Sequence, residues 1–390
     1  MQRASDHYDV LIVGGGIHGV GVAQAAAAAG YRTLLVERER LAYGTSSRSS
    51  KLIHGGLRYL ASGQFSLVRT SLKERELLLR IAPGLVRRAN FLVPLYSHSK
   101  YRPWQMRVGL TAYALLAGGA RSARFRTVPR AEWAHLDGLV TAGLRAVFCY
   151  GDAQTDDVAL TEAVMRSAEA LGAELVCPGV FVHAERRDDR SIVEIECRGE
   201  RRTIETRVIM NAAGPWLNDV LARVNPPLPP YAMDLVQGTH VVLPGTLERG
   251  VYYAEAVRDQ RPVFMMPWHG ATLVGTTETA YQGDPAHVAP LDAEIEYLLA
   301  TWRHYFPERS ASTTASFAGL RVLPRADGSL NRRPRETVFL TDRAAAPRIV
   351  SIAGGKLTAY RATALAALAR ARASLPPERA IADTATLPIA

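Results

Sequence analysis

The chain has 390 residues with a hydrophobic content of 48%, which is enough for two subdomains with substantial cores and excludes a disordered polymer. It has no run of about 18 or more uncharged apolar residues and no signal-peptide cleavage site, so we expect a cytosolic protein. Its 3 cysteines show no CxxC spacing, which argues against a disulfide framework and predicts no metal site. The formal net charge is +10, but the arginines that produce it are spread along the chain, so we expect no nucleic-acid partner.

The first predicted unit spans residues 8–37, with the sequence "YDVLIVGGGIHGVGVAQAAAAAGYRTLLVE". An apolar run, a glycine turn, an alanine-rich stretch and a second apolar run predict a strand, a helix and a parallel strand. Gly14, Gly16 and Gly19 fit the GxGxxG pattern, in which the helix N-terminus faces a pyrophosphate. Glu37 follows the second strand, where a carboxylate can accept hydrogen bonds from an adenosine ribose. The unit therefore predicts a dinucleotide site that suits either NAD or FAD.

The next segment, residues 44–60, has the sequence "GTSSRSSKLIHGGLRYL". Its hydroxyl groups are short enough to meet phosphate oxygens where a bulky side chain would not fit. A polar surface turn is the alternative interpretation, but an exposed turn has no use for Leu52, Ile53 and Leu57. The composition therefore favours a loop that contacts a ligand.

Two later segments also end in turns of the kind that bind ligands. Residues 207–216, "RVIMNAAGPW", predict a strand that runs into small residues. Residues 348–373 predict a strand, a Gly-Gly pair and a long alanine-rich helix that opens with Lys356. An extended FAD must be contacted by several segments that are far apart in the sequence. Together with the glycine-rich turn of residues 8–37, these two turns therefore predict one discontinuous cofactor domain.

A second region lies between these parts. The runs "GVYYAEAV", "RPVFMMPWHG" and "ATLVGTTE" are short, rich in β-formers and punctuated by Gly and Pro, which predicts an antiparallel sheet that forms a substrate wall. Helical periodicity predicts packing helices over 66–82 and 159–173. We therefore expect an α/β fold with a discontinuous Rossmann-like FAD-binding domain and a substrate domain with a mostly antiparallel β-sheet. The expected FAD-binding parts are 1–90, 151–230 and 321–390, and the expected substrate-domain parts are 91–150 and 231–320.

From about Tyr8 almost to its C-terminus, the chain resembles FAD-dependent glycerol-3-phosphate dehydrogenase, a family within the D-amino-acid-oxidase and glycine-oxidase superfamily. The long serine-rich block is the specific motif, because it separates this family from its amine-oxidising relatives better than the dinucleotide motif does. No histidine or cysteine lies in a recognisable flavin-attachment motif, so we expect non-covalent FAD. The matching motifs, in order, are "GGGIHGVG", "GTSSRSSKLIHGGLRYL", "FLVPLY", "YGDAQTDDVAL", "NAAGPW", "GTHVVL", "MPWHGATLVGTTE", "GLRVLP" and "GGKLTAYR".

The resemblance implies that the serine-rich block runs along the FAD pyrophosphate and under the flavin ring, and that other parts of the chain complete the cofactor site. The cofactor-binding residues it implies are Gly14, Gly16, Ile17, His18, Gly19, Glu37, Arg38, Thr45, Ser46, Ser47, Ser49, Ser50, Lys51, Leu52, Ile53, His54, Val180, Ala213, Gly214, Trp216, Arg321, Gly355, Lys356, Leu357 and Thr358.

The implied reaction is oxidation of glycerol 3-phosphate, or a closely related small anionic alcohol, to the ketone, with hydride transfer to flavin N5. Arg58, Tyr59 and Arg335 are the implied substrate-binding residues. The match of Arg335 is looser, because the neighbouring Arg332 and Arg333 compete for it. Guanidinium groups bind phosphate bidentately, so converging arginines suit a phosphorylated substrate.

The implied catalytic residues are His240, Arg321 and Lys356. His240 would accept the hydroxyl proton, because an unperturbed imidazole pKa of about 6.5 suits a base near neutral pH. Arg321 would stabilise the developing alkoxide. Lys356 would favour the anionic reduced flavin.

Other functions stay open at this stage. The same fold would serve a flavin oxidase of the glycine-oxidase type that acts on an amine, an amino acid or a 2-hydroxy acid with O₂ as acceptor. A dehydrogenase would instead pass electrons to quinone or another acceptor. A non-catalytic flavin-binding subunit is the third alternative, but such a subunit would not need His240, Arg321 and Lys356.

Two features bear on partners. Typical family members continue with a helical C-terminal domain beyond the segment that matches the end of this chain, which leaves quinone reduction and assembly open. Residues 101–126 mix arginine with tryptophan, tyrosine and leucine. This segment predicts either a helix packed on the substrate domain or a peripheral contact with the cytoplasmic face of an anionic membrane. The oligomeric state is not indicated.

Overall fold

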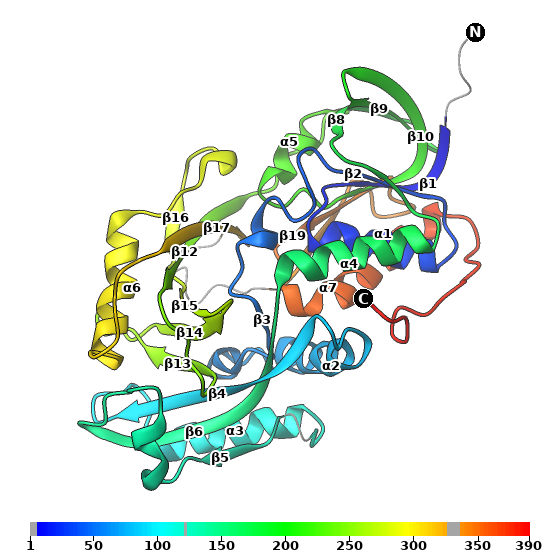
Figure 1. The fold of residues 1–390 in the computed structure, drawn as a ribbon. Helices are drawn as coiled ribbons and strands as arrows, with labels where there is room; N and C mark the ends of the chain where they lie inside the picture. Colours follow the sequence, from blue (N-terminus) through cyan, green and yellow to red (C-terminus); the bar gives the residue numbers. More distant parts are fainter. Residues whose placement is uncertain (1–5, 121–122, 326–335) are drawn as a thin grey trace.

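The structure is a computed structural model that describes residues 6–120, 123–325 and 336–390. Two β-sheets lie side by side, and the chain crosses between them several times (Figure 1). Helix α1 (Ile17–Ala28) packs on the first sheet, whereas strands β12 (Met233–Leu243) and β17 (Ala315–Pro324) belong to the second. The predicted α/β class with two sheets is confirmed.

The first sheet has nine strands among the described residues, in the order β11-β8-β9-β10-β1-β2-β7, with β19 beside β10 and β18 beside β19. Strands β2, β1, β10 and β19 are mutually parallel. The strands are β1 (Asp6–Val13), β2 (Thr33–Val36), β7 (Glu174–Val176), β8 (Val180–Arg186), β9 (Ser191–Cys197), β10 (Glu200–Asn211), β11 (Val224–Asn225), β18 (Val338–Thr341) and β19 (Ile349–Ala353).

The second sheet has ten strands within the described ranges, in the order β16-β12-β15-β14-β13-β4-β6-β3, with β17 beside β12 and β5 beside β6. Most of its pairs are antiparallel, and β13 with β4 is a parallel pair. The strands are β3 (Leu52–Ile53), β4 (Val86–Tyr96), β5 (Phe125–Thr127), β6 (Leu144–Thr155), β12 (Met233–Leu243), β13 (Val251–Glu255), β14 (Pro262–Trp268), β15 (Ala271–Gly275), β16 (Thr279–Tyr281) and β17 (Ala315–Pro324).

Helices cover both sheets. Helix α1 is buried on almost every side because it packs against its own sheet and against α4 and α7, which form a layer with it in Figure 1. Helices α2 and α3 pack together beside β4 and β6, and α6 covers β12 and β15. The helices are α1 (Ile17–Ala28), α2 (Phe65–Ile81), α3 (Pro103–Leu116), α4 (Asp157–Ala170), α5 (Leu217–Leu221), α6 (Asp292–Tyr305) and α7 (Tyr360–Ala371).

The helices predicted over 66–82 and 159–173 correspond to α2 and α4. Helix α4 begins two residues earlier than expected, because the Asp156 carboxylate accepts the backbone N–H groups of Val158 and Ala159 at 2.9 and 3.0 Å and so caps the helix. None of the helices in the described part of the chain combines the length and apolar composition that a membrane-spanning helix needs.

Sheet membership does not follow the expected domain boundaries residue by residue. The pair β4·β6 runs in one register from Val86 opposite Thr155 to Leu95 opposite Ala146, and the register then shifts so that Tyr96 lies opposite Leu144. Strand β3 and the start of β4 therefore lie in the second sheet although they fall within 1–90. The expected boundaries followed changes in sequence composition, whereas the hydrogen bonds between β4 and β6 extend across the boundaries placed after residues 90 and 150.

Candidate active site

A cavity of about 370 Å³ opens at the carboxyl ends of the parallel strands of the first sheet. Because β1, β2, β10 and β19 run in one direction, the residues that follow each strand meet at the same edge of the sheet. Residues of β12 and β17 from the second sheet line the cavity as well. Ligands of open α/β sheets bind at this edge, so the cavity is the candidate active site.

The glycine-rich turn forms part of the cavity wall. Gly14 has a φ of +109°, which side chains other than hydrogen rarely tolerate. A Cβ atom on Gly19 would overlap the carbonyl oxygen of Gly14, so Gly19 allows α1 to pack against the turn and does not itself line the cavity. No side chain of α1 caps its N-terminus, and the Ile17 N–H instead donates to the Ser46 hydroxyl at 2.9 Å. The turn and the serine-rich loop therefore meet at the positive end of the helix dipole.

The Glu37 carboxylate lies at the end of β2 and accepts the N–H groups of Gly15 and Glu39 at 2.6 and 2.8 Å. Across this end of the cavity, the Arg38 guanidinium lies 5.2 Å from the centroid of the Trp216 indole. Tyr43, which the sequence analysis did not single out although it directly precedes the serine-rich block, lies 6.3 Å from Trp216 between ring centroids. A carboxylate beside aromatic faces can hold a ribose and a base.

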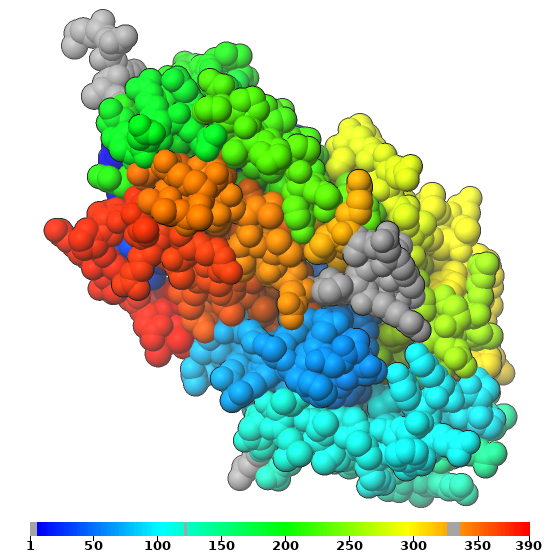
Figure 2. Space-filling model, turned by 180° about the vertical axis from the view of Figure 1, so that it is seen from behind, coloured from blue at the N-terminus to red at the C-terminus, as the bar shows by residue number. Residues whose placement is uncertain are grey.

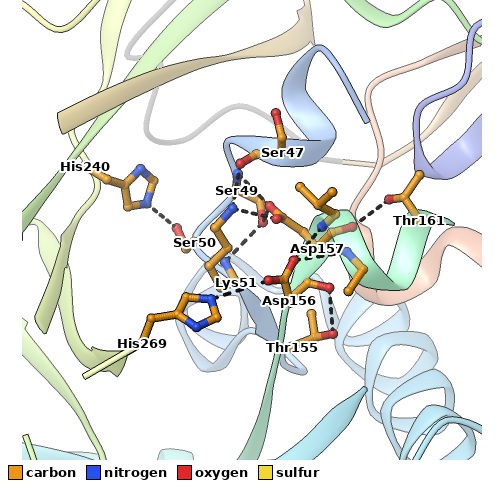
Figure 3. Close-up of polar contacts among 12 residues, drawn as sticks. Ser47, Ser49, Ser50, Lys51, Thr155, Asp156, Asp157, Thr161, His240 and His269 are labelled. Carbon is orange, nitrogen blue, oxygen red and sulfur yellow. Dashed lines mark hydrogen bonds and ion pairs between the residues drawn. The ribbon is translucent and has the colours of Figure 1, made fainter. Parts of the chain in front are cut away.

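The hydroxyl groups of the serine-rich loop point in different directions. Thr45 donates to the carbonyl of Leu320 at 2.6 Å, which ties the loop to β17. Ser47 donates to the Gly44 carbonyl at 3.2 Å and does not line the cavity. Ser49 donates to the Asp157 carboxylate at 2.7 Å (Figure 3). Much of the loop's polarity therefore stabilises the loop itself.

Four predicted cofactor-binding residues lie outside the cavity lining: Gly19, Ser47, Lys51 and Ile53. Ile53 is fully buried in β3, and Lys51 is 4% exposed and paired with a carboxylate. The predicted cofactor-binding residues that do line the cavity are Gly14, Gly16, Ile17, His18, Glu37, Arg38, Thr45, Ser46, Ser49, Ser50, Leu52, His54, Val180, Ala213, Gly214, Trp216, Arg321, Gly355, Lys356, Leu357 and Thr358.

His240 lines the cavity from β12, and its side chain is almost fully buried. Gly275 pairs with it in β15, and a Cβ atom there would overlap the imidazole. The ring stacks on Phe317 with 4.9 Å between centroids, and Nε2 lies 2.9 Å from the Ser50 hydroxyl. Among the described residues, Nδ1 has no hydrogen-bond partner. Ser50 is therefore the polar group that orients the imidazole.

Burial, reinforced by the positive charges of Arg321 and Lys51, lowers the pKa of His240 from 6.5 to about 3. This differs from the expected value near 6.5, because the sequence pattern contains no information on burial. Burial also lowers the pKa of His54 to about 3 and of His18 to about 4. All three imidazoles are neutral at neutral pH and can accept a proton or a hydrogen bond.

Arg321 lines the cavity from β17 and is held by groups of the β15–β16 connection. It donates to the Glu278 carboxylate at 3.2 Å and to the Thr276 hydroxyl at 3.0 Å. The Glu278 side chain is only 1% exposed and also pairs with Arg261 at 2.9 Å. Neither Glu278 nor Arg261 was predicted from the sequence, although the acidic residue that ends the run "ATLVGTTE" is a usable signal. The carboxylate fixes the Arg321 guanidinium at the cavity wall.

Lys356 and Tyr59 line the cavity together, and the Lys356 ammonium lies 3.8 Å from the centroid of the Tyr59 ring. Arg58 contacts Tyr59, with 3.3 Å between its guanidinium and the phenol oxygen, but does not itself line the cavity. Arg335 lies outside the described residues. The structure thus brings His240, Arg321, Lys356 and Tyr59 to one cavity.

The residues present fit the FAD that the sequence resemblance implies. A buried Nδ1 of His18 has no hydrogen-bond partner in the described part of the chain, so it can take one from a ligand. Gly355 has a φ of +97° and lies so close to His18 that a Cβ atom would meet the imidazole. A dinucleotide would be held by three features of the cavity wall: the glycine backbone at Gly14 and Gly355, the N-terminus of α1 and the Glu37 carboxylate.

Comparisons with known proteins agree with this geometry. The model of the DAO family, described as FAD dependent oxidoreductase, matches residues 9–361. The chain is 38% identical to the glycerol-3-phosphate dehydrogenase of Pseudomonas aeruginosa over 370 residues, which cover 93% of this chain and 71% of that protein. It is 36% identical to the D-erythritol 1-phosphate dehydrogenase of Brucella abortus over 364 residues, which cover 90% of this chain and 71% of that protein.

A solved structure supports the same conclusion. The fold matches that of the glycerol-3-phosphate dehydrogenase of Bacillus halodurans in complex with FAD, with a TM-score of 0.75 and 27% identity over 98% of this chain and 68% of that one. The predicted FAD cofactor and the predicted oxidoreductase activity are thereby confirmed. The chain belongs to the DAO family of FAD-dependent oxidoreductases.

Proposed function

We propose that the enzyme oxidises a small phosphorylated polyol, glycerol 3-phosphate or a close relative such as D-erythritol 1-phosphate, at a secondary alcohol to give the ketone. The observation that carries the proposal is that the cations Arg321 and Lys356 line the same cavity as the neutral imidazole of His240. The relatives that share 36% and 38% identity are named for these two substrates.

The phosphate of such a substrate suits Arg321. Its planar guanidinium can form two parallel hydrogen bonds to a phosphate, and Glu278 and Thr276 hold it in one orientation beforehand. Lys356 adds a second positive charge in the same cavity. We propose Tyr59, Arg58 and Arg335 as further substrate-binding residues.

Oxidation of the alcohol removes one proton from oxygen and one hydrogen with two electrons from carbon. When bound, FAD supplies the acceptor for the two electrons. His240 accepts the hydroxyl proton, because its imidazole is neutral and its ring is fixed by Ser50 and Phe317. The negative charge of a substrate dianion beside His240 would stabilise the imidazolium and raise its pKa above about 3, which makes the ring a stronger base in the complex.

The test is an anaerobic titration of the purified FAD-loaded protein, with the absorbance of the oxidised flavin as the signal. Glycerol 3-phosphate and D-erythritol 1-phosphate are compared with glycine, sarcosine and a 2-hydroxy acid. We expect bleaching by a polyol phosphate and by none of the other compounds. Bleaching by an amine or amino acid only would assign the enzyme to the oxidase alternative and refute the proposal.

A second experiment follows the reduced enzyme as it meets electron acceptors. We propose quinone, or another acceptor in place of O₂, as the physiological oxidant. Reoxidation at least about 10-fold faster by a soluble quinone than by O₂ at equal concentration would agree. The opposite ratio would indicate an oxidase, as would stoichiometric release of hydrogen peroxide.

We also propose that α3 contacts the surface of an anionic membrane. Trp104, Val108 and Leu115 are 63%, 61% and 74% exposed, and their spacing places them along one side of the helix. Arg102 and Arg107 are exposed on the same helix or at its start. Helix α3 lies at the end of the molecule away from the first sheet (Figure 1), and Figure 2 shows the cyan surface of this region at that end.

Sedimentation with vesicles containing phosphatidylglycerol tests the membrane contact. The expected results are binding that weakens as salt is raised and loss of binding in a Trp104→Ser/Leu115→Ser variant. Val257 is 58% exposed but lies outside α3, so Val257→Ser is the matched control and should bind normally. Equal sedimentation of all three proteins with and without vesicles would contradict the proposed contact.

A further inference from the structure

A buried ion pair joins the serine-rich loop to the first residue of α4. The Lys51 ammonium donates to the Asp157 carboxylate at 2.5 Å, with side-chain exposures of 6% and 0%, and it also donates to the Ser47 carbonyl at 2.6 Å. The other oxygen of Asp157 accepts the Ser49 N–H and hydroxyl at 3.1 and 2.7 Å (Figure 3). One carboxylate therefore holds two residues of the loop.

The backbone of the loop is unusual at the same point. Lys51 has a φ of +58°, in the left-handed region that residues other than glycine adopt only when their surroundings hold them there. The ion pair holds the side chain, while the Lys51 N–H donates to the Ser49 hydroxyl at 3.1 Å and the Lys51 carbonyl accepts the Thr155 N–H at 2.9 Å. The consequence is visible in Figure 3, where Lys51 points toward Asp157 while the adjacent Ser50 points toward His240.

A second contact leads from the ion pair to the same histidine. The Lys51 ammonium lies 5.4 Å from the centroid of the Phe317 ring, and Phe317 stacks on His240. The imidazole is therefore fixed at its edge by Ser50 and on its face by Phe317, and both groups contact or adjoin Lys51. Since Nδ1 has no hydrogen-bond partner in the described part of the chain, Ser50 decides how the ring is turned.

Net stability alone does not account for the pair. Removing two charges from water costs about as much free energy as their attraction returns, so a buried ion pair is weak evidence of stabilisation and is better explained by the geometry it imposes. Neither Lys51 nor Asp157 lines the cavity, so neither is placed to touch cofactor or substrate.

We propose that the Lys51–Asp157 ion pair is a positioning device for His240: it holds the loop so that Ser50 keeps the imidazole in the orientation that accepts the substrate proton. This inference rests on the proposed role of His240 as proton acceptor. Lys51 and Asp157 act through Ser50 and Phe317, and their removal should slow substrate oxidation without weakening the binding of substrate or FAD.

A double-mutant cycle tests this coupling. Rates of flavin reduction at saturating substrate are measured for the native enzyme, His240→Ala, Asp157→Asn and the double variant. We expect Asp157→Asn to reduce the rate about 10–100-fold in the native background, since a positioned general base contributes about 10²–10⁴-fold, and less than about 2-fold in the His240→Ala background. Equal losses in both backgrounds would overturn the inference.

The cycle separates failure of the inference from failure of the proposed function. If His240→Ala alone leaves flavin reduction undiminished, His240 is not the proton acceptor and the proposed function of this residue fails. If His240→Ala is slow but Asp157→Asn is not, only the positioning device fails. The dissociation constants of FAD and of a non-oxidisable phosphate analogue are measured in parallel, and they should change less than about 3-fold in Asp157→Asn, whereas a general loss of structure would weaken both.

A smaller change keeps the inference testable if Asp157→Asn does not fold. Ser50→Ala removes one hydroxyl and should show the same non-additivity with His240→Ala, so a native rate in Ser50→Ala would overturn the inference. The matched control is Asp342→Asn, because Asp342 likewise forms an ion pair, with Arg186 at 2.8 Å, has a side chain 1% exposed and accepts backbone N–H groups, but its partner Arg186 belongs to the first sheet and not to the serine-rich loop. We expect its rate of flavin reduction to stay within about 2-fold of native.

Discussion

Replacing Glu294 by glutamine tests how the strand that carries His240 is held in place. Glu294 lies in the first turn of α6 and is 5% exposed. Each of its carboxylate oxygens accepts two side-chain hydrogen bonds, so one buried group ties α6 to β12 and to the segment that contains Glu278. The four donors are Gln237, Thr239, Thr277 and Thr279, at 2.5, 2.6, 2.7 and 2.7 Å.

The cost of Glu294→Gln follows from these contacts. A hydrogen bond to a charged group contributes about 1.5–3 kcal/mol, compared with about 0.5–1.5 kcal/mol between neutral groups. Threonine hydroxyls can turn and accept from the new amide, so the four bonds can survive without their charge. The difference is about 1–1.5 kcal/mol for each bond. Glutamine avoids the cost of burying a charge, which offsets part of this loss, so we expect the free energy of unfolding to fall by about 2–4 kcal/mol.

Urea unfolding of the FAD-saturated protein measures this change. Glu296→Gln is the matched control, because Glu296 lies on the same helix but is 63% exposed in its pair with Arg303, and an exposed pair contributes about 0–1 kcal/mol. Native stability in Glu294→Gln, or a loss no larger than in Glu296→Gln, would refute the reasoning.

The pH dependence gives an independent check. Burial opposes ionisation of Glu294, but the hydrogen bonds outweigh it and hold its pKa below the ordinary value of 4.5. The native state then releases its proton more readily than the unfolded chain, so the stabilisation is present above pH 4.5 and is lost as the pH falls through the native pKa. The difference between native protein and Glu294→Gln should therefore shrink below pH 4.5.

Three further predictions concern single positions. Gly19→Ala should abolish FAD retention, measured as flavin absorbance after gel filtration, because the new Cβ would overlap the Gly14 carbonyl oxygen; a yellow variant would contradict this. Gly109→Ala in α3 should raise the free energy of unfolding by about 0.5–1 kcal/mol, because alanine loses less conformational entropy in a helix and its Cβ would meet no atom within 4 Å; a loss of stability would count against this prediction. The pKa of His240 is about 3 in the native protein and 6.5 in the unfolded chain, so below pH 6.5 this residue contributes about 1.4 kcal/mol per pH unit to the loss of stability of the FAD-free protein. His240→Asn should make the slope shallower by that amount while His18 and His54 keep their own contributions, and an unchanged slope would contradict the prediction.

The βαβ unit over residues 8–37 was predictable because its elements are adjacent in the chain. Strand, turn and helix depend on residues within a few positions of one another, and the roles of Gly14 and Gly19 follow from hard-sphere contacts in one tight turn. The helix over 159–173 was predicted for the same reason. Its true start was not, because the Asp156 cap depends on side-chain geometry at the end of β6.

Most of the cofactor-binding residues were predicted from the resemblance to the glycerol-3-phosphate dehydrogenase family, and fewer from the spacing of glycines and hydroxyl groups in the sequence. A serine-rich loop with a Gly-Gly pair indicates a ligand, but not which hydroxyl meets it. Ser46 lines the cavity beside the N-terminus of α1, whereas Ser47, one position later, donates to the backbone of its own turn. Nothing in the sequence distinguishes these two neighbours, because both are small, polar and compatible with a tight turn.

The sequence by itself determined the dinucleotide turn and the family, and it predicted many of the residues that line the cavity. Only the tertiary structure decided which charges are paired. Lys51 meets Asp157 across 106 positions, and Arg321 meets Glu278 across 43. Only the fold buries His240 and lowers its pKa. The physical reason is that local pattern specifies backbone conformation over a few residues, whereas burial and ion pairing depend on which distant segments are brought into contact.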